Sequence, residues 1–239
     1  MCITRTNIPN DMKKLLFLLF MLCPMLCAAQ NEWELPTSGN QPQEQKKDAK
    51  ANADDSRKNG NASPLLTNVK DWEYIKEGAV PEVDGKVVFA CDTDFPGKSA
   101  QQIYELAYTA LDSLAHSKEQ IQSGIALVNR KSNIVVARYQ EWLNFSSNFL
   151  ALDRTKFQYT IIATCSDGHL HLTLERISYN YEENRSTGFK TTAEKWIADK
   201  VAVNKNRTKL RPGMAKFRKK TIDRQKEIFS YITGCMKRQ

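Results

Sequence analysis

The chain has 239 residues, of which 41% are hydrophobic and 26% are charged, a composition that is ordinary for a globular protein. No apolar run reaches the roughly 18 residues that a membrane-spanning helix needs, so we expect no transmembrane segment in the mature chain. The formal net charge is +8, which directs attention to anionic partners. After subtraction of the N-terminal segments described next, the length suits one domain.

Residues 1–29 have the organisation of a secretory signal peptide. Read from Met12, two lysines precede an apolar run at 15–22, and small residues at 27–29 precede the polar Gln30. A positive start, a short apolar stretch and small residues at the cleavage site are what the export machinery recognises. We therefore expect Met12 to be the true start and cleavage to follow Ala29. The mature protein is expected to be periplasmic or secreted.

The cysteines bear on both the leader and the fold. A lipoprotein signal is the alternative to plain cleavage, because Cys23 and Cys27 lie where a lipid-bearing cysteine could stand. Each follows a leucine, whereas the lipoprotein peptidase favours a small residue there, so lipid anchoring is not expected. The remaining Cys91, Cys165 and Cys235 are too widely spaced for a zinc or redox motif. We expect them to be buried as small apolar side chains, and the sequence leaves open whether any two form a disulfide.

Residues 30–63 are expected to form a disordered polar tether. Asn, Gln, Lys, Asp, Ala, Ser and Gly dominate this stretch, and Trp33 and Leu35 are its only sizeable apolar side chains. Such a segment cannot bury enough apolar surface to offset the loss of chain entropy on folding. A single α+β domain is therefore expected over residues 64–239.

The apolar pattern of this domain predicts a strand, a helix, two hairpins and then further helices. A strand at 86–91 lies between Asp-Gly and Pro-Gly turns, and Ser99 is placed to cap a helix that ends near His116. The apolar residues of that helix recur at helical spacing: Ile103, Leu106, Ala107, Ala110, Leu111 and Leu114. The other expected elements are hairpin strands at 121–128 and 134–145, hairpin strands at 157–166 and 169–179, and helices at 192–200 and 221–237.

The second hairpin gives the sharpest prediction. Its strands flank Asp167-Gly168, a dipeptide that accepts the positive φ angles of a two-residue type I′ turn. That turn sets Cys165 opposite Leu170, Ala163 opposite Leu172 and Ile161 opposite Leu174 on a core face, and it leaves polar side chains on the other face. We expect an antiparallel sheet of about five strands, with the first helix packed on its apolar face and further helices at the C-terminus.

Three stretches carry a resemblance to a known family. They read GAVPEVDGKVVF at 78–89, AEKWI at 193–197 and KFRKKTID at 216–223. These stretches resemble secreted proteins of Gram-negative gut bacteria that carry a domain of unknown function described as having a TATA-box-binding-protein-like fold. The resemblance covers roughly residues 74–236 and implies that fold, but it implies no activity and no site residues. DNA binding is not expected, because an exported protein does not meet the chromosome.

Few side chains form a recognisable chemical site. His169 and His171 are the candidate metal ligands, because an i, i+2 spacing places both imidazoles on one side of a strand. Further ligands are not assured, so we expect solvated polar residues, and no metal or other cofactor. Asp92 and Asp94 could form an acidic pair for acid–base chemistry, although a strand end that enters a turn explains them. The expected register sends Cys165 to the core, away from any histidine, so it is not expected to act as a nucleophile.

The segment 200–220 carries nine basic residues and no acidic one. Such a run creates a local positive potential that attracts polyanions. The residues expected to bind an anion are Lys205, Arg207, Lys209, Arg211, Lys216 and Arg218. Outside the cytoplasm the candidate ligands are lipopolysaccharide phosphates, anionic lipid headgroups and acidic glycans. The alternative is a solvated loop and helix start whose charge aids solubility.

Two functions are compatible with these patterns. The first is a non-enzymatic binding or scaffolding module of the cell envelope, whose partner is an anionic envelope component or another envelope protein. The second is an enzyme of unrecognised type with a site on the exposed sheet face. A deep pocket with perturbed titratable groups would favour the enzyme, and a shallow sheet face would favour the binding module.

N-terminal sequencing of the exported protein is expected to find Gln30, or a residue close to it, as the first residue, because the peptidase cleaves after small side chains. An intact Met1 or Met12 terminus in the cytosol would contradict the predicted export. A lipid on Cys23 or Cys27 would instead place the protein on a membrane surface.

Overall fold

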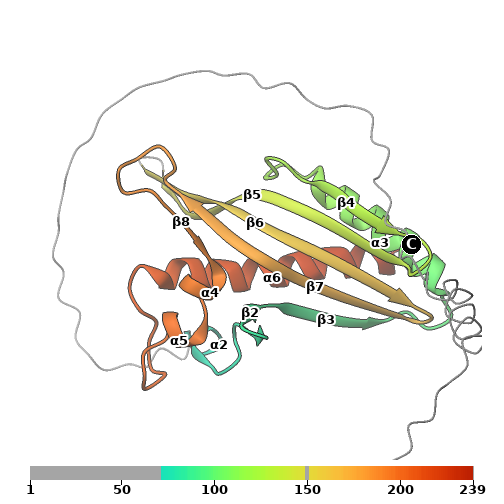
Figure 1. Ribbon diagram of the computed structural model, residues 1–239, viewed down its shortest axis with the longest axis horizontal. Coiled ribbons are helices and arrows are strands. Elements are labelled where there is room, and N and C mark those ends of the chain that lie inside the picture. Colours follow the sequence, from blue (N-terminus) through green and yellow to red (C-terminus); the bar gives the residue numbers. More distant parts are fainter. Residues whose placement is uncertain (1–70, 149–150, 239) are drawn as a thin grey trace, which may run out of the picture. The chain divides into compact units, whose positions relative to one another are not determined.

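A computed structural model describes residues 71–148 and 151–238 (Figure 1). The predicted leader at 1–29 and tether at 30–63 lie outside the described residues. The helices are α2 (Trp72–Ile75), α3 (Ala100–Ala115), α4 (Ala193–Trp196), α5 (Asp199–Ala202) and α6 (Met214–Lys237). The strands are β1 (Glu82–Val83), β2 (Lys86–Val87), β3 (Phe89–Asp94), β4 (Gly124–Asn129), β5 (Ile134–Asn148), β6 (Ala151–Ser166), β7 (His169–Tyr181) and β8 (Phe189–Thr192).

The main sheet is antiparallel and has six strands in the order β3-β7-β6-β5-β4, with β8 paired to β7 beyond the end of β3. A separate two-stranded ribbon joins β1 to β2. The α+β class and the antiparallel sheet are therefore confirmed. The strand β8 was not predicted, because it lies in a polar stretch after Tyr181 and forms only by pairing with the end of β7.

The predicted register of the second hairpin is confirmed. Cys165 pairs with Leu170, Ala163 with Leu172 and Ile161 with Leu174. These six side chains are all buried. Since side chains alternate along a strand, their neighbours in sequence point to the opposite side of the sheet.

Helices α3 and α6 cover the buried face of the sheet (Figure 1). Helix α3 begins with a capping box, in which the Ser99 hydroxyl accepts a hydrogen bond from the Gln102 backbone and the Gln102 side chain accepts one from the Ser99 N–H. The predicted apolar stripe of the last helix is buried: Ile222, Phe229, Ile232 and Met236. We call the other side of the sheet, on which none of the described helices packs, the outer face.

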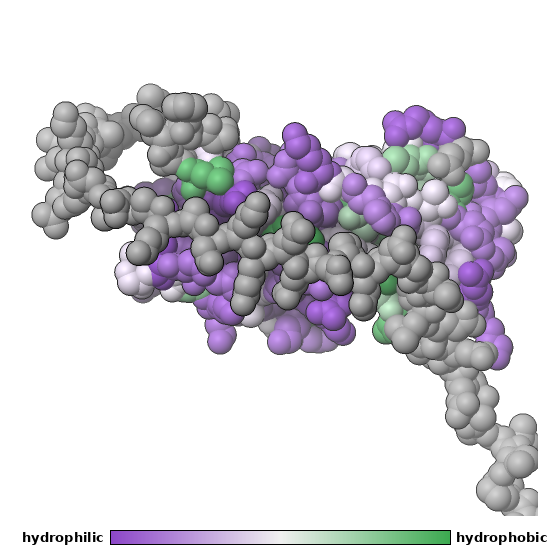
Figure 2. Space-filling model, turned by 90° about the horizontal axis from the view of Figure 1, so that it is seen from above, coloured by the Kyte–Doolittle hydropathy of each residue, from purple (hydrophilic) through white to green (hydrophobic). Residues whose placement is uncertain are grey.

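The polar character of the surface is visible in Figure 2, where hydrophilic residues dominate the side of the molecule that is seen and hydrophobic ones form small separate patches. Among the described residues, the large hydrophobic side chains that are exposed come from different elements: Trp72, Val83, Ile121, Leu127, Leu152 and Tyr231. None of the described helices is long and apolar enough to cross a membrane. Recognition of a partner by the described surface is therefore expected to use polar groups.

One strand prediction and one turn prediction are corrected. The strand expected at 86–91 is divided, since Lys86–Val87 pair with β1 across Asp84-Gly85 while the main sheet begins at Phe89. At Asp84 and Gly85 the φ angles are 50° and 73°, as a type I′ turn requires. At the second hairpin only Gly168 has a positive φ, of 73°, so that turn is not type I′.

The physical reason lies in what the second turn touches. The Asp167 carboxylate accepts a hydrogen bond of 2.7 Å from the Ala100 N–H at the start of α3, and the Gly168 N–H donates to the Lys98 carbonyl. These contacts hold the turn against the helix start. Tertiary hydrogen bonds, rather than the dipeptide alone, thus select the turn conformation.

The C-terminal helices also differ from expectation. The helix expected at 192–200 is two short helices, α4 and α5, and α6 begins at Met214 rather than at residue 221. Residues 214–220 are good helix formers, and Phe217 and Arg218 are buried among them. The second half of the basic segment is therefore part of a packed helix rather than of a solvated loop.

Substitution Gly168→Ala is expected to lower the free energy of unfolding by about 1–2 kcal/mol, because a Cβ disfavours the left-handed region. Gly124→Ala is the matched control, since Gly124 does not have a positive φ and a Cβ there meets no heavy atom within 4 Å. The control is expected to leave stability unchanged or to raise it slightly. Urea unfolding measures both, and equal effects of the two substitutions would contradict the turn geometry.

Candidate outer-face site

A row of hydrogen-bonded polar side chains crosses the middle of the outer face. Gln140, Gln158 and Ser178 occupy paired positions on β5, β6 and β7. The Gln158 amide donates to Gln140 Oε1 at 2.6 Å, and the Ser178 hydroxyl donates to Gln158 Oε1 at 3.0 Å. Three strands thus present a fixed set of amide and hydroxyl groups.

A groove with a volume of about 860 Å³ opens around this row, between β4 and the central strands. Arg138 lines it from β5 and makes no ion pair within the described part of the chain. Arg176 lines it from β7, where a φ of 55° and a shift in register mark one extra residue in the strand. The Arg176 guanidinium lies 3.3 Å from Glu175. The groove is therefore polar and rich in cationic donors.

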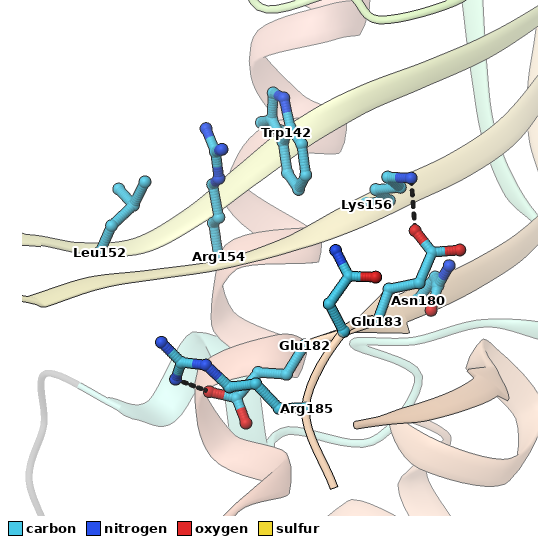
Figure 3. Close-up of a pocket in the computed structure, with 9 residues that line it drawn as sticks. Trp142, Leu152, Arg154, Lys156, Asn180, Glu182, Glu183 and Arg185 are labelled. Carbon is cyan, nitrogen blue, oxygen red and sulfur yellow. Dashed lines mark hydrogen bonds and ion pairs between the residues drawn. The ribbon is translucent and has the colours of Figure 1, made fainter. Parts of the chain in front are cut away.

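A second pocket, of about 510 Å³, lies at one end of the same face (Figure 3). In it the Arg154 guanidinium carbon lies 3.7 Å from the centre of the Trp142 ring. Lys156 forms an ion pair with Glu183, and its hydrogen bond lowers the pKa of that carboxyl. Arg154, in contrast, forms no ion pair among the described residues. The pocket therefore has one cation that no carboxylate neutralises.

The two pockets adjoin each other along the strands. Gln140 pairs with Gln158 in the groove, and two residues further along β5 Trp142 pairs with Lys156 in the second pocket. From Arg138 to Trp142 the distance along β5 is roughly 13 Å at about 3.3 Å per residue. The pockets are thus parts of one extended surface, which an extended ligand can follow.

The opposite end of the outer face carries the histidines. His169 Nδ1 lies 2.8 Å from Asp94, His169 Nε2 lies 3.0 Å from Asp92, and His171 Nδ1 lies 2.8 Å from Asp92. Hydrogen bonds with Asp94 and then Asp92 raise the pKa of His169, and those with His171 and then His169 lower the pKa of Asp92. The aspartates that the sequence assigned to a strand end therefore pair with both histidines across β3 and β7.

No group of three or more His, Cys, Asp and Glu side chains within residues 71–148 and 151–238 is placed to hold a metal ion. His169 and His171 share a face, as their spacing predicts, but both of the His169 ring nitrogens face carboxylates.

The three cysteines within the described residues form no disulfide, and they differ in burial. Cys165 is buried, as expected, and burial raises the pKa of its thiol to about 12. A thiol with so high a pKa is a poor nucleophile at neutral pH. Cys91 and Cys235 are half-buried, so the expectation of burial is wrong for these two. Cys91 lies on β3, an edge strand of the main sheet, and Cys235 lies in the last turn of α6.

In the folded protein, the basic residues of the segment 200–220 have different environments. Arg218 is fully buried, and its guanidinium donates to the Tyr74 carbonyl at 2.6 Å, the Ile197 carbonyl at 2.5 Å and the Asp199 carboxylate at 2.6 Å. Burial opposes ionisation of Asp199, but hydrogen bonds from Arg218 and the Gly78 N–H outweigh it and lower the pKa of that carboxyl. An outside anion therefore cannot reach Arg218, and its place in the predicted anion site is corrected.

Two more members of the predicted anion site have internal partners. Arg207 lies 3.1 Å from Asp199. The Lys216 ammonium lies 2.8 Å from Asp153 and over the rings of Phe145 and Tyr181. The remaining members, Lys205, Lys209 and Arg211, are exposed. The absence of acidic residues between 200 and 220 was misleading, because acidic residues from outside the segment fold against it.

The fold defines the class of protein. The sheet with helices on one face is a TATA-box-binding-protein-like fold, and a family model described as "Domain of unknown function (DUF4468) with TBP-like fold" matches residues 89–180. A TBP-like protein from Parabacteroides distasonis shares this fold, with a TM-score of 0.52 and 19% identity over 66% of this chain and 97% of that one. The matched family segment contains β3 to β7, which build the outer face, and ends before the basic segment.

The chain belongs to the DUF4468 family. The crystal structure of a DUF4468 family protein from Bacteroides ovatus is 39% identical to it, with a TM-score of 0.65 over 70% of this chain and 94% of that chain. A comparison with curated proteins finds no match. The family description assigns no activity, and a shared fold does not define one.

Substitution Arg218→Ala is expected to lower the free energy of unfolding by about 3 kcal/mol, because it removes one of the donors to the partly buried Asp199 and the side-chain donor to two carbonyls. Arg211→Ala, in the same segment but exposed, is the control and is expected to change stability by less than about 0.5 kcal/mol. Chemical denaturation compares the two variants. A small effect of Arg218→Ala would mean that the side chain is solvated, as the sequence alone suggests.

Proposed function

We propose that the protein is a non-enzymatic binding module of the cell envelope, and that the outer face of its sheet holds an extended anionic ligand. What supports binding over catalysis is the form of the site. Both pockets are open grooves on a sheet face, and hydrogen-bond donors line each of them. The larger groove has amide, hydroxyl and guanidinium groups, and the second pocket has amide, ammonium and guanidinium groups beside two carboxylates.

The observation that carries the proposal is the pair Arg138 and Arg154. Each projects from the uncovered face, each lies in one of two adjoining pockets, and neither forms an ion pair with a described residue. A guanidinium keeps its charge at every physiological pH and presents a fork of N–H donors that fits carboxylates and phosphates. Two such groups on one surface favour a ligand with repeated negative charge.

The proposed location follows from the predicted signal peptide at 1–29. An exported domain meets envelope components and extracellular polymers rather than the chromosome. The TBP-like fold does not support DNA binding here, because unrelated sites are found on the same fold.

An enzyme on the same face is the alternative. His171 with Nδ1 on Asp92 is an arrangement that a general base can use. Neither of the two grooves is lined by this pair, whereas both are lined by groups that donate hydrogen bonds. The geometry therefore favours binding.

The exposed residues Lys205, Lys209 and Arg211 offer a competing surface for an anion. Two variants distinguish the outer face from this competing surface. The double variant carries Arg138→Ser and Arg154→Ser, and the triple variant carries Lys205→Ser, Lys209→Ser and Arg211→Ser. Retention is measured on vesicles of anionic lipid, on polyglutamate and on polygalacturonate, at low salt and at 1 M salt, where the Debye length is roughly 3 Å.

We expect the double variant to lose at least tenfold in affinity for the ligand that is retained, because a hydrogen bond to a charged group contributes about 1.5–3 kcal/mol. The triple variant is expected to bind within about twofold of the unchanged chain, since these three residues line neither pocket. Loss of binding in the triple variant alone would move the site to the basic segment. Binding unaffected by the double variant, or insensitive to salt, would contradict the proposed surface.

A further inference from the structure

The pocket at the end of the outer face has a charge balance that selects among anions. Its lining holds three cations and two carboxylates, which leaves one net positive charge: Arg154, Lys156 and Arg185 against Glu182 and Glu183. Lys156 is paired with Glu183, and Arg185 lies 2.7 Å from Glu182. The unmatched charge is that of Arg154, so the pocket suits one carboxylate rather than a multiply charged group.

Trp142 holds the Arg154 side chain in a position to bind a carboxylate. The two side chains stand next to each other on β6 and β5 and project from the same side of the sheet (Figure 3). Stacking on the indole restricts the guanidinium plane and leaves its N–H edge free to donate. A flat guanidinium with an accessible edge binds a carboxylate through two parallel hydrogen bonds.

The remaining polar groups in the pocket suit hydroxyls. The carboxylates of Glu182 and Glu183 accept hydrogen bonds from hydroxyls and repel a second negative charge, and the Asn180 amide both donates and accepts. Trp142 and the exposed Leu152 supply apolar surface for the carbon atoms of a ring. A ring with one carboxylate and several hydroxyls meets all of these groups.

We infer that this pocket recognises a uronic acid unit of an acidic polysaccharide. The inference rests on the proposed function, which it makes more specific. Arg154 pairs in register with Asn144, six residues along β5 from Arg138, which is a backbone separation of roughly 20 Å. Its guanidinium stacks on Trp142, whose backbone lies roughly 13 Å from that of Arg138. One sugar cannot span both guanidinium groups, so a polymer engages both, with its carboxylates at intervals along the face.

Three polymers of similar length test the inference with the purified full chain: polygalacturonate, its methyl ester and polyglutamate. Polygalacturonate has hydroxyls and carboxylates, the ester has hydroxyls without charge, and polyglutamate has the charge without hydroxyls. We expect polygalacturonate to bind at least tenfold more tightly than either of the others, as measured by calorimetry.

Two tryptophan variants provide the matched comparison. Trp142→Ala is expected to weaken polygalacturonate binding about tenfold, because it removes both the apolar surface for the sugar ring and the stacking partner of Arg154, and to weaken polyglutamate binding less, because only the stacking is lost there. Trp72→Ala removes a tryptophan that is 63% exposed on α2, and it is expected to change neither. Circular dichroism verifies that both variants are folded.

Equal affinity for polyglutamate and polygalacturonate would overturn the inference in favour of an acidic polypeptide, while the proposed anionic surface would stand. Equal affinity for the methyl ester would show that the carboxylate is not recognised. Unchanged affinity of the Trp142→Ala variant for polygalacturonate would show that the pocket is not the binding site. The proposed function fails by a different result, namely that the Arg138 and Arg154 substitutions affect no anionic ligand.

Discussion

The register of the β6–β7 hairpin is the constraint on which both the core and the candidate site depend. A slip of one residue would turn Leu170 and Leu172 toward water and His169 and His171 toward α3, because successive side chains point to opposite faces. Burial of each leucine contributes about 1.5–3 kcal/mol, so the register is strongly selected. The contacts of the turn with the start of α3 hold one end of the hairpin, and the extra residue at Arg176 adjusts the other. The same alternation that fills the core leaves a polar outer face without a covering helix.

Several cations of the C-terminal region bind acidic groups of the same chain. Besides the Arg218 contacts, the Arg224 guanidinium donates two hydrogen bonds of 2.8 Å to the buried Glu141 carboxylate and so joins α6 to β5. A buried carboxylate without such a partner would destabilise the fold by several kcal/mol. Because α6 packs on the buried face, Arg218 and Arg224 meet acceptors there and cannot serve the outer face. The unpaired cations of the outer face come from the sheet itself, which distinguishes their role from that of the basic segment.

Structural features that depend on local periodicity could be predicted from the sequence, whereas those that depend on tertiary contacts could not. The hairpin register, the Ser99 cap and the apolar stripe of α6 follow from alternation, helical spacing and capping chemistry. Two Asp-Gly dipeptides nevertheless adopt different turns, since only the one at Asp167 is bonded to a helix start. The outer-face pockets were not predicted, although Arg138, Gln140 and Trp142 alternate on the water-facing side of a predicted strand. What the sequence lacks is the pairing of β5 with β6 over its whole length, which brings Arg154 beside Trp142.

The most direct test of the outer face as the ligand surface is an NMR titration of the chain with an oligogalacturonide. The chain has four tryptophans, and their indole N–H signals report separately on different places in the protein. The account predicts that the indole signal of Trp142 shifts in a saturable way, together with the guanidinium signals of Arg138 and Arg154, while the signal of Trp196 stays in place. Shifts confined to residues 204–213, with the Trp142 signal unchanged, would contradict it.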